Sequence, residues 1–478
     1  MPLLPRLRAP AVVAARPRRP RRPLLSGRAA AESAIDARTL SLWWVLPFAG
    51  VLLSIAIIPL VAPHLWHRVY GLVMLVWALA FLVPAAWRFG FDAVLDLLLH
   101  TALLEYIPFI ILLFALFTVA GGIHVAGTLR GTPGTNTALL AIGTAIASFT
   151  GTTGASMLLV RPVLRANRER KHRAHTMIFF IFLVSNIGGA LTPLGDPPLF
   201  LGFLKGVDFF WPTEHLFAPM VLLAALLLLA YHTMDARYFR READEIRERG
   251  GPVEPLRIQG GVNIPLLMLV VLVVLMEGVW HPGAVTFLKQ EIAIEVVVGD
   301  FLLLAIAAYS IWATPVLVRN ANGFTWGAMI EVAKVFAAIF VTIIPAIAIL
   351  RAGHEGALAW LVALTSNPDG TPNPTMYFWL TGALSSFLDN APTYLIFFNL
   401  AGGDPQVLMG PLAKVLGAIS AGAVFMGANS YIGNAPNFMV RAIAEEQGVK
   451  MPSFFGYCGW AAVFLLPCFG LLTVIFYR

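Results

Sequence analysis

Cysteine is nearly absent from this sequence, and charged residues are scarce. Of 478 residues only Cys458 and Cys468 are cysteines, which excludes a disulfide framework and a metal site built from cysteines. Charged residues make up 12% of the chain and hydrophobic residues 58%, more apolar surface than a soluble domain needs. The short alternating segments of a transmembrane β-barrel are also missing. The composition therefore predicts an all-α polytopic membrane protein.

The basic residues gather in loops and at the N-terminus. Residues 1–42 contain nine arginines and no lysine, are interrupted by prolines and have no apolar core of signal-peptide length. This composition predicts a disordered tail, of which residues 1–38 are expected to be dispensable for function. Because the net charge of +7 comes largely from these arginines and from loops, it does not indicate a nucleic acid as partner.

One polar stretch interrupts an apolar crossing in the first half of the chain. Residues 177–204 are about long enough to cross a bilayer, but the segment 185–202 (S-N-I-G-G-A-L-T-P-L-G-D-P-P-L-F-L-G) holds glycines and prolines that break a helix. A break at membrane depth survives only against a cavity or buried protein, and secondary transporters build ion sites in this way. The alternative is a polar loop between two short helices. The break offers Ser185, Asn186, Thr192 and Asp196.

Three further apolar stretches are interrupted. Residues 136–164 are split by T-G-T-T-G-A-S and residues 375–400 by S-S-F-L-D-N-A-P-T, and each half is too short to span, which predicts two re-entrant hairpins. Residues 412–444 form a second broken helix, split by G-A-N-S-Y-I-G-N-A-P-N. These three interruptions offer Thr152, Thr153, Ser386, Asp389, Asn390, Asn429 and Asn434.

The order of hairpin followed by broken helix therefore occurs twice. The hairpin tips lie about 235 residues apart (152 and 387) and the breaks about 243 (186 and 429). This arrangement predicts two inverted repeats, each with five crossings and one hairpin, whose breaks meet at a central binding site. The predicted parts are the tail (1–42), the first repeat (43–233), a hydrophilic connector (234–262) and the second repeat (263–478).

Two basic segments predict the orientation. Residues 165–173 and 235–262 contain five and six lysines and arginines and fall on one side of the membrane, which we expect to be the cytoplasm. The connector has both charge signs at helical spacing and is expected to be a solvated helix. Interfacial helices are expected at 91–100 and near 325–336, where Glu331 and Lys334 would form a local pair.

Asp196 and Asp389 are the only acids within the four polar interruptions. A carboxylate in a span costs at least about 2.5–3.5 kcal/mol, so we expect both to be functional. The alternative is a helix cap, which would suit Asp196 before Pro197 and Pro198. The asparagines could coordinate sodium or pin the unwound backbone. Sodium is expected at Asp389, Asn390, Asp196 and Asn186.

The motifs S-N-I-G-G-A-L-T-P-L-G-D (185–196) and S-S-F-L-D-N-A-P (385–392) resemble the ion transporter superfamily. They look like its NhaD-type sodium/proton antiporters and the related citrate carriers, and the resemblance covers most of residues 43–478. The dicarboxylate branch typically shows Ser-Asn-Thr at both hairpin tips. Here the tips read Thr152-Thr153-Gly154 and Leu388-Asp389-Asn390, which weakens a carboxylate substrate. The resemblance implies a homodimer in a bacterial inner membrane, with Na⁺ and H⁺ as transported ions and no further cofactor.

Two acids at the breaks, with no arginine evident at the midplane, favour a sodium/proton antiporter in which both carboxylates alternately bind Na⁺ and H⁺. The alternative is a sodium- or proton-coupled carrier of citrate or another organic anion, whose site needs helix N-termini, amides or arginine. A membrane-embedded enzyme or channel is a third class. No nucleophile–base pair or metal-ligand cluster stands out in the sequence, so we expect no enzyme.

Overall fold

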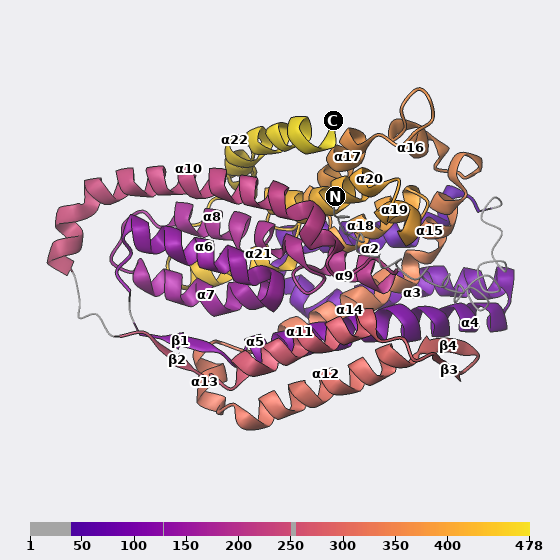
Figure 1. Cartoon of the computed structure of the whole chain (residues 1–478), viewed down its shortest axis with the longest axis horizontal. Coiled ribbons are helices and arrows are strands. Elements are labelled where there is room, and N and C mark those ends of the chain that lie inside the picture. The colour runs from indigo at the N-terminus through magenta and orange to yellow at the C-terminus, as the bar shows by residue number, and fades with distance from the viewer. Residues whose placement is uncertain (1–39, 128, 250–254) are drawn as a thin grey trace, which may run out of the picture.

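The computed structural model describes residues 40–127, 129–249 and 255–478 (Figure 1). The predicted disordered tail lies almost wholly outside the described residues, as does part of the predicted connector. In the first half the elements are η2 (Leu42–Val45), α2 (Leu46–Val61), α3 (Pro63–Phe89), α4 (Phe91–Thr101), the π-helix η3 (Ala102–Tyr106), α5 (Ile107–Ala120), β1 (His124–Ala126), α6 (Pro133–Thr150), α7 (Thr152–Ala166), α8 (Ala174–Leu183), η4 (Ile187–Leu191), α9 (Pro197–Leu204) and α10 (Trp211–Arg249).

The second half follows the connector. Its elements are β2 (Arg257–Gln259), α11 (Asn263–Val279), β3 (Ala284–Phe287), β4 (Gln290–Ala293), α12 (Ile294–Ala313), α13 (Val316–Ala321), α14 (Trp326–Thr342), α15 (Ile344–Arg351), η5 (Gly353–Glu355), α16 (Ala359–Leu364), α17 (Pro374–Phe387), α18 (Asn390–Leu400), α19 (Pro405–Met409), α20 (Ala413–Met426), η6 (Gly427–Asn429), α21 (Ala435–Glu446), α22 (Phe454–Leu472) and the π-helix η7 (Thr473–Tyr477).

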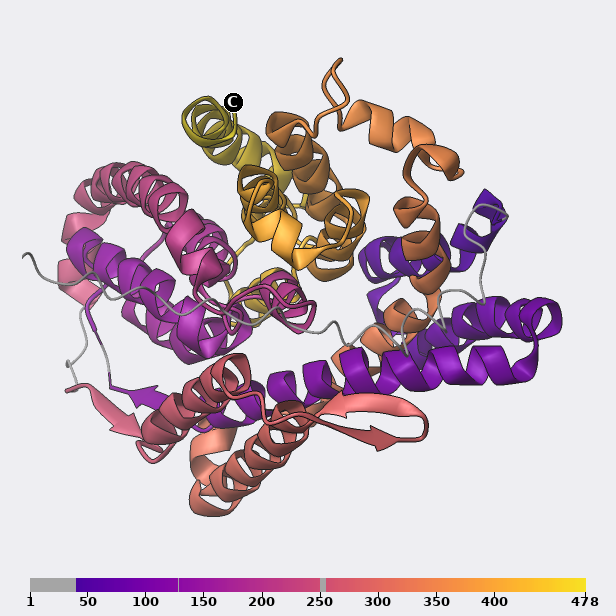
Figure 2. The ribbon, with the colours of Figure 1, turned by 45° about the vertical axis from the view of Figure 1, so that its right-hand side comes forward.

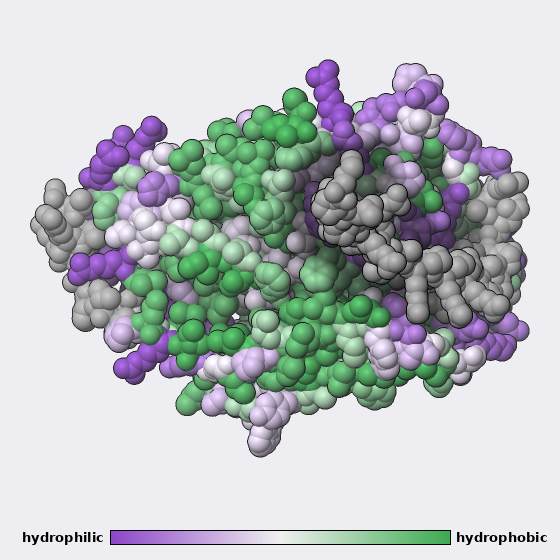
Figure 3. All heavy atoms as spheres, in the orientation of Figure 1, coloured by the Kyte–Doolittle hydropathy of each residue, from purple (hydrophilic) through white to green (hydrophobic). Residues whose placement is uncertain are grey.

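The fold is that of an all-α polytopic membrane protein, as the composition predicts. Among the described residues, seven helices are long and apolar enough to cross a membrane, and α14 with α15, bent by 41°, would make an eighth. Two shorter apolar helices, Asn263–Val279 and Ala413–Asn429, lie where the sequence predicts two more crossings. On the face in Figure 3, hydrophobic residues dominate the middle and hydrophilic ones gather mainly toward the ends of the long axis.

Two hydrophobic cores divide the helices. One core lies among the hairpins, the broken helices, α10 and α22, and the other among α2, α3, α5, α11, α12, α14 and α15. Figure 2 shows the two groups apart, the second containing the long lower helices. α9 and α18 take part in both cores: Leu199 and Tyr394 belong to the first, while Phe200 and Leu395 belong to the second. We call the helices around the first core the first body and those around the second core the second body. The half-helices α9 and α18 therefore lie between the two bodies.

The expectation of a separate interfacial helix at 91–100 is wrong. α4 continues through η3 into α5, so that Phe91–Ala120 form one apolar helix. Neither glycine nor proline occurs between residues 91 and 107, so nothing in the local sequence ends the helix there.

The interfacial helix near 325–336 is also wrong, because this segment is the first part of α14. The predicted local pair between Glu331 and Lys334 is not formed, because both side chains contact α3 instead. Glu331 accepts a hydrogen bond of 2.6 Å from the indole of Trp66, and the Lys334 ammonium lies 5.3 Å from the centre of the Tyr70 ring. Charged groups in this position find aromatic partners on the neighbouring span.

Two small antiparallel sheets close the ends of the spans. β1 pairs with β2, which ties the segment after α5 to the segment before α11. β3 and β4 form a hairpin whose two central residues, Leu288 and Lys289, both have positive φ, as a tight two-residue turn requires. The hairpin lies at the opposite end of the molecule from the far end of α10 (Figure 1).

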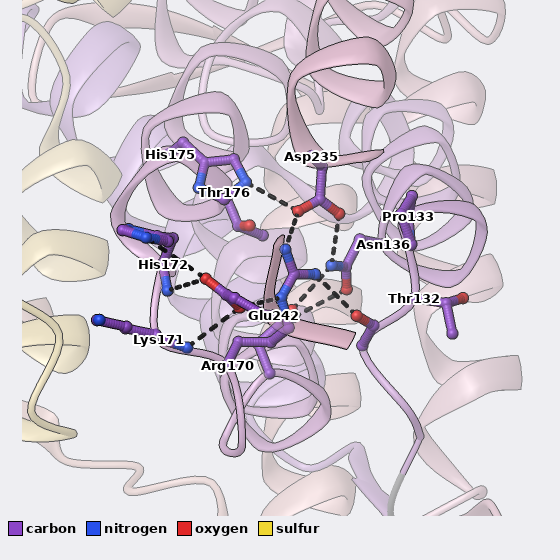
Figure 4. Close-up of polar contacts among 12 residues, drawn as sticks. Thr132, Pro133, Asn136, Arg170, Lys171, His172, His175, Thr176, Asp235 and Glu242 are labelled. Atoms are coloured by element: carbon purple, nitrogen blue, oxygen red, sulfur yellow. Dashed lines mark hydrogen bonds and ion pairs between the residues drawn. The ribbon is translucent and has the colours of Figure 1, made fainter. Parts of the chain in front are cut away.

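A buried ionic network joins the basic segment 165–173 to α10 (Figure 4). The guanidinium of Arg170, 4% exposed, contacts Asp235 at 2.6 Å and Glu242 at 3.1 Å. His175 Nε2 lies 2.9 Å from the same oxygen of Asp235, and Asn136 donates to the other oxygen at 3.0 Å. The sequence predicts a solvated helix here, but Asp235 and Glu242 are buried, because α10 packs these turns against the loop that carries Arg170.

Sidedness is open to a direct test. In a variant without Cys458 and Cys468, a cysteine at exposed Arg168 or Arg241 should react only with reagents that cross the membrane, because we expect this end to face the cytoplasm. A cysteine at exposed Lys289, in the β3–β4 turn at the other end, is the matched control and should react with impermeant maleimide added to intact cells. The reverse pattern would invert the predicted orientation.

Candidate functional site

Both predicted hairpins and both predicted breaks are present. α6 and α7 meet at Gly151, and α17 and α18 meet at Leu388 and Asp389. The first break separates α8 from α9 and the second separates α20 from α21. Each break rests on the tip of the hairpin from its own half of the chain, because the unwound backbone needs hydrogen-bond partners that lipid cannot supply.

The two hairpin–break units make matching hydrogen bonds at one constant offset of 238 residues. The hydroxyl of Thr192 donates to the carbonyl of Ser148, and 238 residues later Ser430 donates to the carbonyl of Ser386. The amides of Leu194 and Ile432, also 238 apart, each donate to these hydroxyls at 3.2 Å. The single offset replaces the two different offsets that the sequence alone indicates. The inverted relation of the repeats stays a prediction.

Glycine is required where each break folds back on itself. A Cβ atom at Gly195 would lie 2.1 Å from the carbonyl oxygen of Gly189, and one at Gly433 would lie 2.4 Å from that of Gly427. No side chain fits at such distances, so the backbone of each break closes through direct contact between glycines. This closure places the next residue, Asp196 or Asn434, at the start of a half-helix.

Asp196 lies where the two units meet, and it is 2% exposed. Its carboxylate accepts a hydrogen bond from Thr152 at 2.9 Å, from Asn434 at 3.1 Å and from Asn390. These three donors come from both hairpin tips and from the other break. Asp196 is therefore the side chain that joins all four polar interruptions.

Asp196 does not cap the helix that it precedes. Its carboxylate makes no capping hydrogen bond to α9. A cap would use the amide of the second or third helical residue, but Pro198 has no N–H and the Leu199 amide donates to the backbone carbonyl of Asp196 at 3.1 Å. Asp389, in contrast, is half-buried and caps α18 by accepting from the amide of Ala391 at 3.0 Å. The two acids thus have different surroundings, although the sequence presents them as equivalent.

The asparagines connect the two breaks. Asn434 donates to the carbonyl of Ser185 at 3.1 Å and to the side-chain oxygen of Asn186 at 3.3 Å. Asn186 in turn donates to the side chain of Asn437 at 2.7 Å, and Asn437 donates to the carbonyl of Gly427 at 2.8 Å. These amides hold one unwound segment against the other.

Two buried amide oxygens have no hydrogen-bond donor within the described parts of the chain: Oδ1 of Asn390 and Oδ1 of Asn429. Asn390 directs its amide nitrogen to Asp196, and Asn429 donates to the hydroxyl of Ser386 at 2.9 Å. A buried acceptor without a partner costs about 1–3 kcal/mol. Amide and carboxylate oxygens are the ligands that hard cations prefer, so Oδ1 of Asn390, whose amide nitrogen contacts Asp196, is a candidate ligand for a cation at that carboxylate.

The remaining predicted residues have more local contacts. Ser185 shares a hydrogen bond of 2.8 Å with Ser156, and Ser386 donates to the carbonyls of Gly382 and Met426. These hydroxyls pin the breaks to the hairpins. Ser156 belongs to the interrupted stretch T-G-T-T-G-A-S that the sequence indicates, whereas Ser148, near the end of α6, is a contact residue that the sequence analysis missed. The only local signal for Ser148 is its position as a polar residue within the last turn of an otherwise apolar helix.

A pocket of about 140 Å³ opens beside Asp196. Thr152, Thr153 and Gly154 line it from α7, Asp196 and Pro197 from the first break, and α5, α14 and α21 complete its walls. Most of its lining is apolar, and the polar groups gather at the hairpin tip. The predicted residue Thr153 faces this pocket and does not take part in the contacts around Asp196.

The sequence matches the model of a family described as putative citrate transport over residues 37–477. No curated protein matches the chain.

Proposed function

Because the chain belongs to the putative citrate transport family, we propose that it carries a citrate-like carboxylate anion across the membrane and couples this movement to a cation bound at Asp196. The family is one of transporters, and this supports a secondary transporter rather than an enzyme for this integral, multi-pass membrane protein.

The observation that carries the proposal is the convergence of four helix N-termini on Asp196. α7 begins at Thr152 and α18 at Asn390, and both of these residues donate to the Asp196 carboxylate. α9 begins directly after Asp196, and α21 directly after Asn434, which donates to the same carboxylate. Each N-terminus carries about half a positive charge from aligned peptide dipoles. Such a site favours anions without any cationic side chain.

The pocket beside Asp196 offers space for the anion. About 10–15 Å³ is enough to hold one water molecule, so a pocket of about 140 Å³ has room for a small organic ligand. The acid itself gives the coupling. A carboxylate anion and an ionised Asp196 repel each other, and a cation bound at Asp196 removes this repulsion. The unpaired amide oxygen of Asn390 would be a further ligand for Na⁺, whereas a proton would bind to Asp196 without any other ligand.

The division into two hydrophobic cores supports transport by alternating access. The site lies on the hairpins and breaks, while α5 and α14 of the other body complete the pocket walls. A shift of one body against the other would change which side of the membrane the pocket faces.

Sodium/proton exchange without an organic anion, which the sequence favours, is the second candidate. It is supported by the acid-and-amide composition of the site and by the capping role of Asp389, which leaves Asp196 as the acid free to exchange ions. The predicted sodium ligands Asn186 and Asp389 would then lie at the rim of the ion site and not at its centre.

The two candidates predict different fluxes. Purified protein in liposomes should take up labelled citrate under an inward gradient of Na⁺ or H⁺, and the uptake should collapse when that gradient is dissipated with an ionophore. Liposomes without protein are the control. Na⁺-driven proton release with no uptake of citrate or dicarboxylates would favour the second candidate and contradict the first.

A further inference from the structure

Side chains of α7 and α21 lead from the pocket toward the end of the molecule that carries the basic segment 165–173. On α7, Thr153, Met157 and Arg161 are spaced four apart and therefore lie on one face. On α21, Met439 lines the pocket and Glu446 lies two turns further along. The segment before α14 adds Phe324, and α14 itself adds Met329.

The middle of this route is closed by soft apolar side chains. Met157 and Met329, 5% and 7% exposed, form a small core with Phe117, and Met439 and Phe324 pack against it. This core contains residues of both bodies. Methionine is unbranched and adapts its shape easily, so a contact made of three methionines can repack without disturbing the helices that carry them.

Arg161 lies at the outer end of the route and is half-buried. Its guanidinium packs over Gly323, where a Cβ atom would come within 2.2 Å of Nη2. Within the part of the chain that the structure describes, Arg161 makes no hydrogen bond or ion pair. Exposed Glu446 acts on it only through the longer-range electrostatic field.

Neighbouring arginines are engaged. Arg165, one turn further along α7, donates to the carbonyl of Val125, and Arg319 donates to the carbonyls of Thr118 and Ser310. Arg441 on α21 bonds Glu445 at 3.0 Å. Arg161 is thus a half-buried fork of N–H donors without an acceptor among the described residues, at the outer end of a route to an anion-favouring pocket. A planar fork of this kind matches a carboxylate.

We propose that Arg161 is an outer binding site for a carboxylate group of the transported anion, which it holds before the Met157–Met329–Met439 contact opens toward Asp196. This inference rests on the proposed function. The site would favour di- and tricarboxylates over monocarboxylates, because the guanidinium attracts an anion of higher charge more strongly. It would act on the side of the membrane that the basic segment 165–173 faces.

The experiment measures citrate uptake in liposomes in which residue 168 faces outward, as checked by cysteine labelling. Arg161→Gln should raise the half-saturating citrate concentration roughly ten-fold, the effect of losing one charged hydrogen-bonded contact, with little change in maximal rate. It should also flatten the decrease of uptake with added salt. Arg161→Lys should keep the salt dependence but recover only part of the affinity, since an ammonium cannot make two parallel hydrogen bonds.

Arg441→Gln is the matched control, because Arg441 already bonds Glu445, and it should leave the half-saturating concentration unchanged. If wild type transports citrate and Arg161→Gln retains both its half-saturation and its salt dependence, the outer site is wrong while the proposed function stands. A loss of maximal rate alone would likewise reduce Arg161 to a structural role. Absence of carboxylate uptake by wild type would overturn both.

Discussion

Asp196→Asn is expected to abolish the stimulation of citrate uptake by an inward gradient of Na⁺ or H⁺, while the protein stays folded. The substitution keeps the size of the side chain and removes the charge that a coupling cation must neutralise. Without that charge, neither Na⁺ nor H⁺ is attracted to the site before the anion binds. The carrier would lose its coupling at the single residue that both hairpins and both breaks share.

The local structure can accommodate this variant. An asparagine amide at position 196 would face the nitrogen of Asn390, but the Asn390 side chain can rotate so that its unpaired Oδ1 accepts instead. Thr152 and Asn434 would still find an oxygen acceptor. The midpoint of thermal unfolding in detergent should therefore fall little or rise, because a buried charge is costly to the folded state.

Asp389→Asn is the matched control at the other predicted acid. Asparagine is as good a helix cap as aspartate, so α18 should keep its N-terminus, and uptake should persist at a substantial fraction of the wild-type rate. The sequence predicts that both acids exchange ions. If Asp389→Asn abolishes uptake and Asp196→Asn does not, the roles that we assign to the two acids must be reversed.

Arg170→Met should destabilise the protein by about 3–5 kcal/mol, the usual cost of removing one partner from a buried ion pair. Arg170 contacts two carboxylates that have almost no access to water, Asp235 at 0% and Glu242 at 4% exposed. Without the guanidinium, His175 and Asn136 still contact Asp235, but the Glu242 carboxylate retains chiefly the backbone amides of the segment 170–173. The free energy of unfolding in detergent, measured with denaturant, checks this.

Glu445→Gln serves as the control for charge removal at the same end of the molecule. It breaks the surface pair with Arg441, whose two side chains are 23% and 43% exposed, and should cost at most about 0.5 kcal/mol. A loss for Arg170→Met no larger than that of Glu445→Gln would show that the buried network contributes little. Restored stability in a triple variant with Asp235→Asn and Glu242→Gln would support the uncompensated charges as the cause.

The sequence by itself was enough to predict the class of the protein, its two hairpins and its two broken helices. These are local properties of the chain, because glycine and proline break a helix wherever they occur and apolar length decides which segments can cross a bilayer. The breaks at residues 185–196 and 427–434 follow directly from such composition. The constant offset of 238 residues, in contrast, appears only when matching hydrogen bonds are compared.

Only the tertiary structure decided which side chains meet. Asp196 and Asp389 look equivalent in the sequence. Asp196 joins four segments because its partners lie as far away as Asn434, 238 residues along the chain, whereas Asp389 caps a helix because its partner, Ala391, is only two residues away. Glu331 contacts Trp66 on α3, and Asp235 contacts Arg170, because helix packing brings together residues that are distant in the sequence. A charged side chain in a membrane protein takes the partner that removes it from lipid, and the packing of distant helices, rather than the neighbouring sequence, determines which partner that is.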